Sequence, residues 1–206
     1  GAFWQPRLVF IDTEFLKTLP HEEFRSGYAE VIKHGVIRDP KYFKFLETEH
    51  ESIFQLDGPS MEYVVQGSCE IKSAVVAEDE REGGVRAILN FGHTVGHAVE
   101  TLAGYGNVRH GEAVAIGMLA AMRIADKMDL IEDDDLCERL ENIANKAALP
   151  TRIPEGMSVD KILRKMLSDK KVLSGRMRFV LADGLGSVVI RDDVSQNILI
   201  ETLEEM

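Results

Sequence analysis

The chain has 206 residues, 45% of them apolar, and its 24 basic and 35 acidic residues give a net charge of −11. This acidic balance excludes a general nucleic-acid or anionic-membrane surface, because most faces of the protein would repel phosphate groups. No apolar run approaches the roughly 20 residues that span a bilayer, and the N-terminus does not have the pattern of a signal peptide.

The chain begins GAFWQPRLVFID, without Met, and passes into four apolar residues, Leu8 to Ile11, that predict a strand. No partner strand follows nearby, so this beginning is typical of a fragment entered in the middle of a longer protein. No G-x-G-x-x-G motif follows a strand in the sequence. If a nucleotide cofactor is used, we expect its main binding domain to lie outside this chain.

A helix is predicted from about Glu22 to Ile37, and it places Glu30 and Lys33 on one face. One interpretation is an ordinary i, i+3 ion pair that contributes roughly 0.2–0.5 kcal/mol. The other makes Glu30 the carboxylate that completes a metal site with two histidines.

Two further helices are predicted, from Lys41 to Glu49 and from Ser60 to about Asp79, on either side of the Asp57-Gly58-Pro59 break. Lys72 lies in an apolar stretch of the second helix. It either extends its ammonium group into solvent or faces a cleft, where it would bind a phosphate or carboxylate group.

The segment from Arg86 to Glu112, RAILNFGHTVGHAVETLAGYGNVRHGE, gathers three of the six histidines. His93 and His97 are four residues apart in a helical pattern, so both project from one face, and His110 opens the next helix, which would bring it back beside them. Such a group suits zinc, which takes three protein ligands and an open position in catalytic sites. Surface or hydrogen-bonded core histidines fit the same spacing. A zinc protease is disfavoured, because Thr94 stands where its glutamate base would follow the first histidine.

The remaining segments predict more helices and one hairpin. His110 to Met128 should be a buried central helix, since its first half is almost wholly apolar. Two amphipathic helices, two strands joined by a Gly184/Gly186 turn, and a last helix should follow at Asp133–Ala148, Ser158–Leu167, Arg176–Leu181, Val188–Ile190 and Val194–Glu204. We therefore expect residues 1–206 to form a single, mainly helical domain with a small β component. Cys69 and Cys137 lack CxxC spacing, which favours a reducing compartment.

Six segments in order resemble the C-terminal domain of the 3-dehydroquinate synthases: FIDTEFLKTLP, RSGYAEVIKHGVI, CEIKSAVVAEDE, RAILNFGHTVGHAVE, HGEAVAIGM and DKKVLSGRMRFVL. The resemblance implies the helical second half of a two-domain α/β plus α enzyme of the shikimate pathway. It also implies cyclisation of 3-deoxy-D-arabino-heptulosonate 7-phosphate to 3-dehydroquinate with loss of phosphate, dependent on NAD and on zinc or cobalt. A cytoplasmic or plastid homodimer is implied as well. Because the N-terminal NAD-binding domain is absent from this chain, we expect the chain alone to fold without turning over.

The resemblance also implies the roles of individual residues. Glu30, His93 and His110 would be the metal ligands. His97 would handle protons and hydrogen-bond near the substrate phosphate. The other catalytic and substrate-binding residues that it implies are Lys33, Lys72, Arg86, Asn90 and one lysine of the pair Lys170 and Lys171.

Two kinds of alternative remain. The first is another sugar-phosphate cyclase, or a metal-dependent polyol dehydrogenase, on the same fold. The dehydrogenase is less favoured because it does not need the anion-binding set Lys72, Arg86, Asn90 and His97. The second is a helical module that binds a partner protein through the surface that a cofactor domain would cover, with an apolar patch around Phe3, Trp4 and Phe10.

Overall fold

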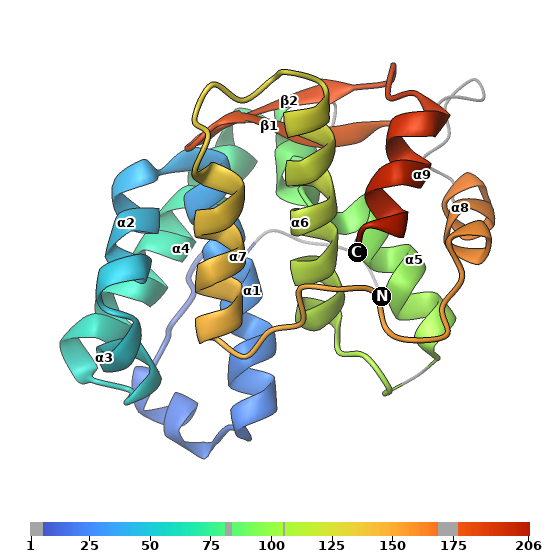
Figure 1. Cartoon of the computed structure of the whole chain (residues 1–206). Coiled ribbons are helices and arrows are strands. Elements are labelled where there is room, and N and C mark those ends of the chain that lie inside the picture. Colours follow the sequence, from blue (N-terminus) through green and yellow to red (C-terminus); the bar gives the residue numbers. More distant parts are fainter. Residues whose placement is uncertain (1–5, 81–83, 105, 169–176) are drawn as a thin grey trace.

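The computed structural model describes residues 6–80, 84–104, 106–168 and 177–206, which are mostly helical (Figure 1). In chain order the elements are the 3₁₀ helix η1 (Thr13–Thr18), α1 (His21–Arg38), α2 (Pro40–Thr48), α3 (His50–Phe54), α4 (Gly58–Glu78), the 3₁₀ helix η2 (Val85–Asn90), α5 (His93–Ala103), α6 (His110–Lys127), α7 (Leu136–Lys146), α8 (Val159–Leu167), β1 (Phe179–Gly184), β2 (Ser187–Arg191) and α9 (Gln196–Glu204). The mainly helical fold with a small β component is therefore confirmed. No described helix is both long and apolar enough to cross a bilayer.

Helix α6 is the centre of the fold, as its apolar sequence predicts. Its residues from Ala113 to Met122 are all buried. Figure 1 shows it in the middle of the molecule, with α1, α2, α4 and α7 to one side and α5, α8 and α9 to the other. It packs against α1, α5, α7, α9 and β1. Burial on all sides explains why this stretch of the helix has no polar side chains.

The small sheet is an antiparallel hairpin with Phe179 opposite Arg191 and Ala182 opposite Val188. Its turn contains Gly186, which has a positive φ of 85° and donates its backbone N–H to the Val36 carbonyl of α1 at 2.8 Å. The hairpin and its glycine turn are confirmed. The first strand starts at Phe179, later than predicted, and it extends to the turn. The predicted first residue, Arg176, lies outside the described residues.

The prediction of a strand from Leu8 to Ile11 is wrong. These residues have no regular secondary structure, and the side chains of Leu8 and Phe10 are 84% and 88% exposed. A strand needs a partner for its backbone N–H and C=O groups, and none of the described strands lies beside this segment. Apolar β-branched composition alone therefore does not make a strand here.

Glycines bring three helices together around the N-terminus of α6. A Cβ placed on Gly111 would lie 1.9 Å from the backbone oxygen of Ser26 in α1, and one on Gly117 would lie 1.8 Å from the backbone oxygen of Gly92, which precedes α5. Only glycine allows backbones to approach this closely. The start of α6 is therefore held against the first half of α1, and its middle is held against the start of α5.

Candidate metal and substrate site

The three predicted metal ligands come from these three converging helices. Glu30 lies in α1, while His93 and His110 are the first residues of α5 and α6. The Oε1 atom of Glu30 is 3.8 Å from Nε2 of His93 and 3.7 Å from Nε2 of His110. Ligand atoms that each bind one zinc ion at about 2.0–2.2 Å are separated from one another by distances similar to those between these three atoms. The structure therefore brings the predicted ligand set together.

Hydrogen bonds at the far side of each imidazole indicate which nitrogen is available. Nδ1 of His93 is 3.1 Å from the Phe91 carbonyl, and Nδ1 of His110 is 3.0 Å from Oε2 of Glu100. A carbonyl and an ionised carboxylate can only accept, so each Nδ1 carries the proton. When either ring is neutral, its lone pair is therefore on Nε2, which faces Glu30.

Oε1 of Glu30, the carboxylate oxygen that faces the two histidines, is buried and makes no hydrogen bond among the described residues. Leaving a buried charged acceptor unsatisfied is unfavourable, whereas a cation between this oxygen and two imidazole nitrogens would remove the cost. One carboxylate and two imidazoles also leave a coordination position for substrate. The residues present therefore fit a divalent ion such as zinc or cobalt.

The second carboxylate oxygen of Glu30 forms an ion pair. Nζ of Lys33 donates to Oε2 at 2.5 Å, and the side chain of Lys33 is only 3% exposed. Burial would raise the pKa of Glu30, but the charge and hydrogen bond of Lys33, with a smaller effect of His93, lower it overall. Burial, and then the charge of Lys33, lower the pKa of His93 to about 4. The carboxylate is therefore ionised and the imidazole neutral near pH 7, which is what a metal requires.

Replacing Lys33 by methionine should destabilise the metal-free protein more than the metal-bound protein. Loss of the ammonium group leaves the Glu30 carboxylate without its countercharge, whereas a bound metal still compensates it. We expect a loss of about 2 kcal/mol, below the usual value for a buried pair because the Glu30 side chain is 33% exposed. Thermal unfolding with chelator and with zinc measures the difference. The double variant Glu30→Gln/Lys33→Met should recover most of the metal-free loss, and equal losses with and without zinc would contradict the prediction.

A cleft of about 360 Å³ opens beside Glu30 and His93. The other residues that line it are Lys33, His34, Lys72, Arg86, Leu89 and Asn90. Arg86 is anchored there, since its Nη1 donates to the Glu80 carbonyl at 3.0 Å and its backbone N–H to Asp79 at 3.1 Å. Lys72 is exposed and also lines the cleft, so the two sequence interpretations of this lysine are compatible. The predicted substrate residues of this set thus gather at one opening, although their roles stay predictions.

Sequence reasoning missed His34. Its side chain is buried beside Lys33, and its Nδ1 has no hydrogen-bond partner among the described residues. Burial, and then the charge of Lys33, lower its pKa to about 4. Its position directly after Lys33 is a signal that the sequence contained, but only the structure shows that it reaches the cleft.

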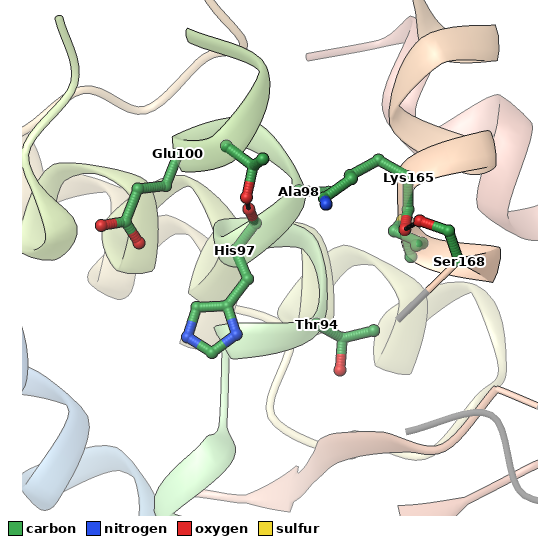
Figure 2. A pocket seen from close by; sticks show the side chains of 8 residues that line it. Thr94, His97, Ala98, Glu100, Lys165 and Ser168 are labelled. Atoms are coloured by element: carbon green, nitrogen blue, oxygen red, sulfur yellow. Dashed lines mark hydrogen bonds between the residues drawn. The ribbon is translucent and has the colours of Figure 1, made fainter. Parts of the chain in front are cut away.

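His97 lies beside the two histidines that are predicted to be ligands and lines a second hollow. The centroid of its ring is 5.0 Å from that of His93 and 5.9 Å from that of His110. Figure 2 shows this hollow, of about 390 Å³, with His97 and Glu100 projecting from α5 and Lys165 reaching in from α8. Lys170 and Lys171 lie outside the described residues, so the predicted phosphate contact from this pair stays a prediction.

Residues 27–172 match the model of the family described as 3-dehydroquinate synthase C-terminal, which is most of the chain. The chain belongs to this family. Curated relatives support the same family, because they are named 3-dehydroquinate synthase. The 3-dehydroquinate synthase of a Synechocystis species is 49% identical over 205 residues, and that of Aliivibrio fischeri is 46% identical over 205 residues. These matches cover 98% and 100% of this chain but 56% of each relative, so the chain spans about half the length of these proteins.

Solved structures of sugar cyclases share the fold of this chain. A 2-deoxy-scyllo-inosose synthase complexed with carbaglucose-6-phosphate, NAD⁺ and Co²⁺ is 27% identical, with a TM-score of 0.83 over 100% of this chain and 58% of that one. A 2-epi-5-epi-valiolone synthase from Streptomyces hygroscopicus with NAD⁺ and Zn²⁺ bound has a TM-score of 0.85 over 94% and 54%; at 24% identity it shows the fold alone. The family model and the curated relatives thus confirm the family resemblance found in the sequence, and these structures confirm its fold.

Proposed function

We propose that this chain is the metal- and substrate-binding part of a 3-dehydroquinate synthase. Such an enzyme converts 3-deoxy-D-arabino-heptulosonate 7-phosphate to 3-dehydroquinate with loss of phosphate. One observation carries the proposal. The buried Oε1 of Glu30, which has no hydrogen-bond partner among the described residues, faces the Nε2 atoms of His93 and His110 at the edge of a cleft lined by cations.

Glu30, His93 and His110 would hold the ion, and the three helices that carry them fix the geometry. When bound, the ion supplies Lewis-acid polarisation of substrate oxygen atoms. Zinc and cobalt both accept one carboxylate and two imidazoles, so either metal fits the proposal.

The cations of the cleft would bind and orient the substrate, which carries a phosphate and a carboxylate. Lys33 and Lys72 provide ammonium groups as point charges, whereas the guanidinium of Arg86 suits two parallel hydrogen bonds to a planar carboxylate. Because Arg86 is anchored through Glu80 and Asp79, it loses little freedom when substrate binds. The amide of Asn90 can both donate to and accept from a substrate hydroxyl.

His97 would act at the phosphate end of the substrate. Its imidazole lies next to both ligand histidines but lines the hollow on the other side, so it can hold or move a proton there without competing for the metal.

NAD is part of the proposal because the 27% identical inosose synthase binds NAD⁺. The sequence of this chain has no dinucleotide fingerprint, so we assign the NAD contacts to a domain outside it. A homodimer in the cytoplasm, as the family implies, belongs to the same proposal.

Phosphate release by the full-length protein with NAD⁺ tests the proposal. We expect release from the heptulosonate phosphate and not from glucose 6-phosphate, because only the former has a carboxylate for Arg86 and its neighbours. A chelator should abolish release, and added zinc or cobalt should restore it. Release from glucose 6-phosphate alone would favour another sugar-phosphate cyclase, for which the likeness to the inosose synthase is the main support. No release from any sugar phosphate by protein with bound metal and NAD⁺ would favour a binding module.

A further inference from the structure

Glu100 ends the segment RAILNFGHTVGHAVE and supports a proposed metal ligand, although the sequence analysis gave it no role. It lies on α5 two turns after His93, and its Oε2 accepts from Nδ1 of His110 at 3.0 Å. Helix α5 therefore provides one ligand directly and contacts the ligand on α6 through a carboxylate. The side chains of Glu100 and His110 are 38% and 46% exposed, so this bond lies at the mouth of the site.

The two ligand histidines are held differently. The ring of His93 is 12% exposed and donates to a neutral backbone carbonyl, that of Phe91. The ring of His110 is much more exposed and donates to a charged carboxylate. A carboxylate on the far nitrogen fixes the tautomer and orientation of an imidazole and increases the electron density on the nitrogen that binds metal. The ligand with less packing around it is thus the one with the stronger hydrogen-bond partner.

We propose that Glu100 is a positioning residue of the metal site, which holds Nε2 of His110 toward Glu30 and thereby raises metal affinity. The proposal rests on the proposed function, because it presupposes a metal at Glu30, His93 and His110. A second metal at His97, Glu100 and His110, whose ligand atoms also lie within 4.8 Å of one another, is the competing interpretation. It would require His110 to lose its remaining ring proton and bridge two cations, whereas the hydrogen bond to Glu100 needs that proton to stay.

The test compares variants of the full-length protein by zinc titration against a competing chelator and by the visible absorption of the cobalt form. Glu100→Gln keeps the shape of the side chain and loses the charge, and Glu100→Asp keeps the charge but withdraws the carboxylate. We expect both to weaken zinc binding by about tenfold or more and to change the cobalt spectrum. Glu112→Gln is the matched control. It removes a charge two residues from His110, and glutamine can keep the cap that Glu112 forms with the Arg109 backbone.

Each outcome decides one point. Unchanged affinity in both Glu100 variants, with one zinc and normal turnover in the wild type, would overturn the role of Glu100 alone. An equal loss of zinc affinity in Glu112→Gln would show that removing any nearby negative charge has the same effect. That result would also overturn the proposed role of Glu100. Two zinc ions in the wild type and one in Glu100→Gln would make Glu100 a ligand instead. Wild-type protein that binds no metal would overturn the proposed function and this inference together.

Discussion

Replacing His93 by alanine in the full-length protein is expected to abolish metal binding and to lower phosphate release by about a thousandfold or more. His93 is the less exposed of the two proposed ligand histidines, and its loss leaves one carboxylate and one imidazole at the mouth of the site. Removing a Lewis acid withdraws several kcal/mol of transition-state stabilisation, which corresponds to a rate loss of this size. Metal content by atomic absorption and the initial rate of phosphate release measure the two effects.

Two histidines serve as controls for this prediction. His21→Ala alters an exposed histidine at the start of α1, and both metal content and rate should stay unchanged. His97→Ala alters the same helix one turn away and should lower the rate while the metal stays bound, because we assign His97 to proton handling rather than to coordination. Retention of metal and turnover by His93→Ala would refute the assignment of this ligand. Loss of metal from His97→Ala together with its retention in His93→Ala would mean that the two histidine roles have been exchanged.

The sequence predicts most of the helices and the return of His110 to the histidine pair. The reason is physical: an apolar run such as Ala113 to Met122 can only be buried, and the short turn before it forces α5 and α6 to lie side by side. The prediction of a strand at Leu8 was wrong because strand formation depends on a partner strand, which local composition does not specify. Helices satisfy their own backbone groups, so local patterns predict them better.

The two interpretations of Glu30 show what the sequence could not decide. Spacing left an ion pair with Lys33 and a metal ligand as alternatives, but in the structure one oxygen pairs with Lys33 and the other faces the histidines. Both interpretations are therefore geometrically compatible. Seeing that one carboxylate can serve both required knowing how α1 packs beside the starts of α5 and α6, which no local pattern of α1 contains. The support of His110 by Glu100 was hidden for the same reason, because it depends on how two helices pack.

Replacing Gly117 by alanine should damage the site from a distance. Because the new Cβ would lie 1.8 Å from the Gly92 backbone oxygen, α5 and α6 would have to separate, and His93 begins α5 directly after Gly92. We expect the free energy of unfolding to fall by about 3 kcal/mol or more, together with weaker zinc binding. Thermal unfolding and zinc titration of the full-length protein measure both.

Gly27→Ala is the matched control, since a Cβ on this α1 glycine meets nothing within 4 Å and alanine should stabilise the helix by up to about 1 kcal/mol. Both glycines lie inside helices, so helix propensity favours alanine at each, and the close contacts with the backbones of Gly92 and Gly96 distinguish the two substitutions. Equal stability and equal zinc binding in Gly117→Ala and Gly27→Ala would contradict the prediction. It would mean that His93 reaches its position opposite Glu30 without the close approach of the α5 and α6 backbones. Loss of stability and zinc affinity in Gly117→Ala alone would show that Gly117 acts on the metal site through helix packing.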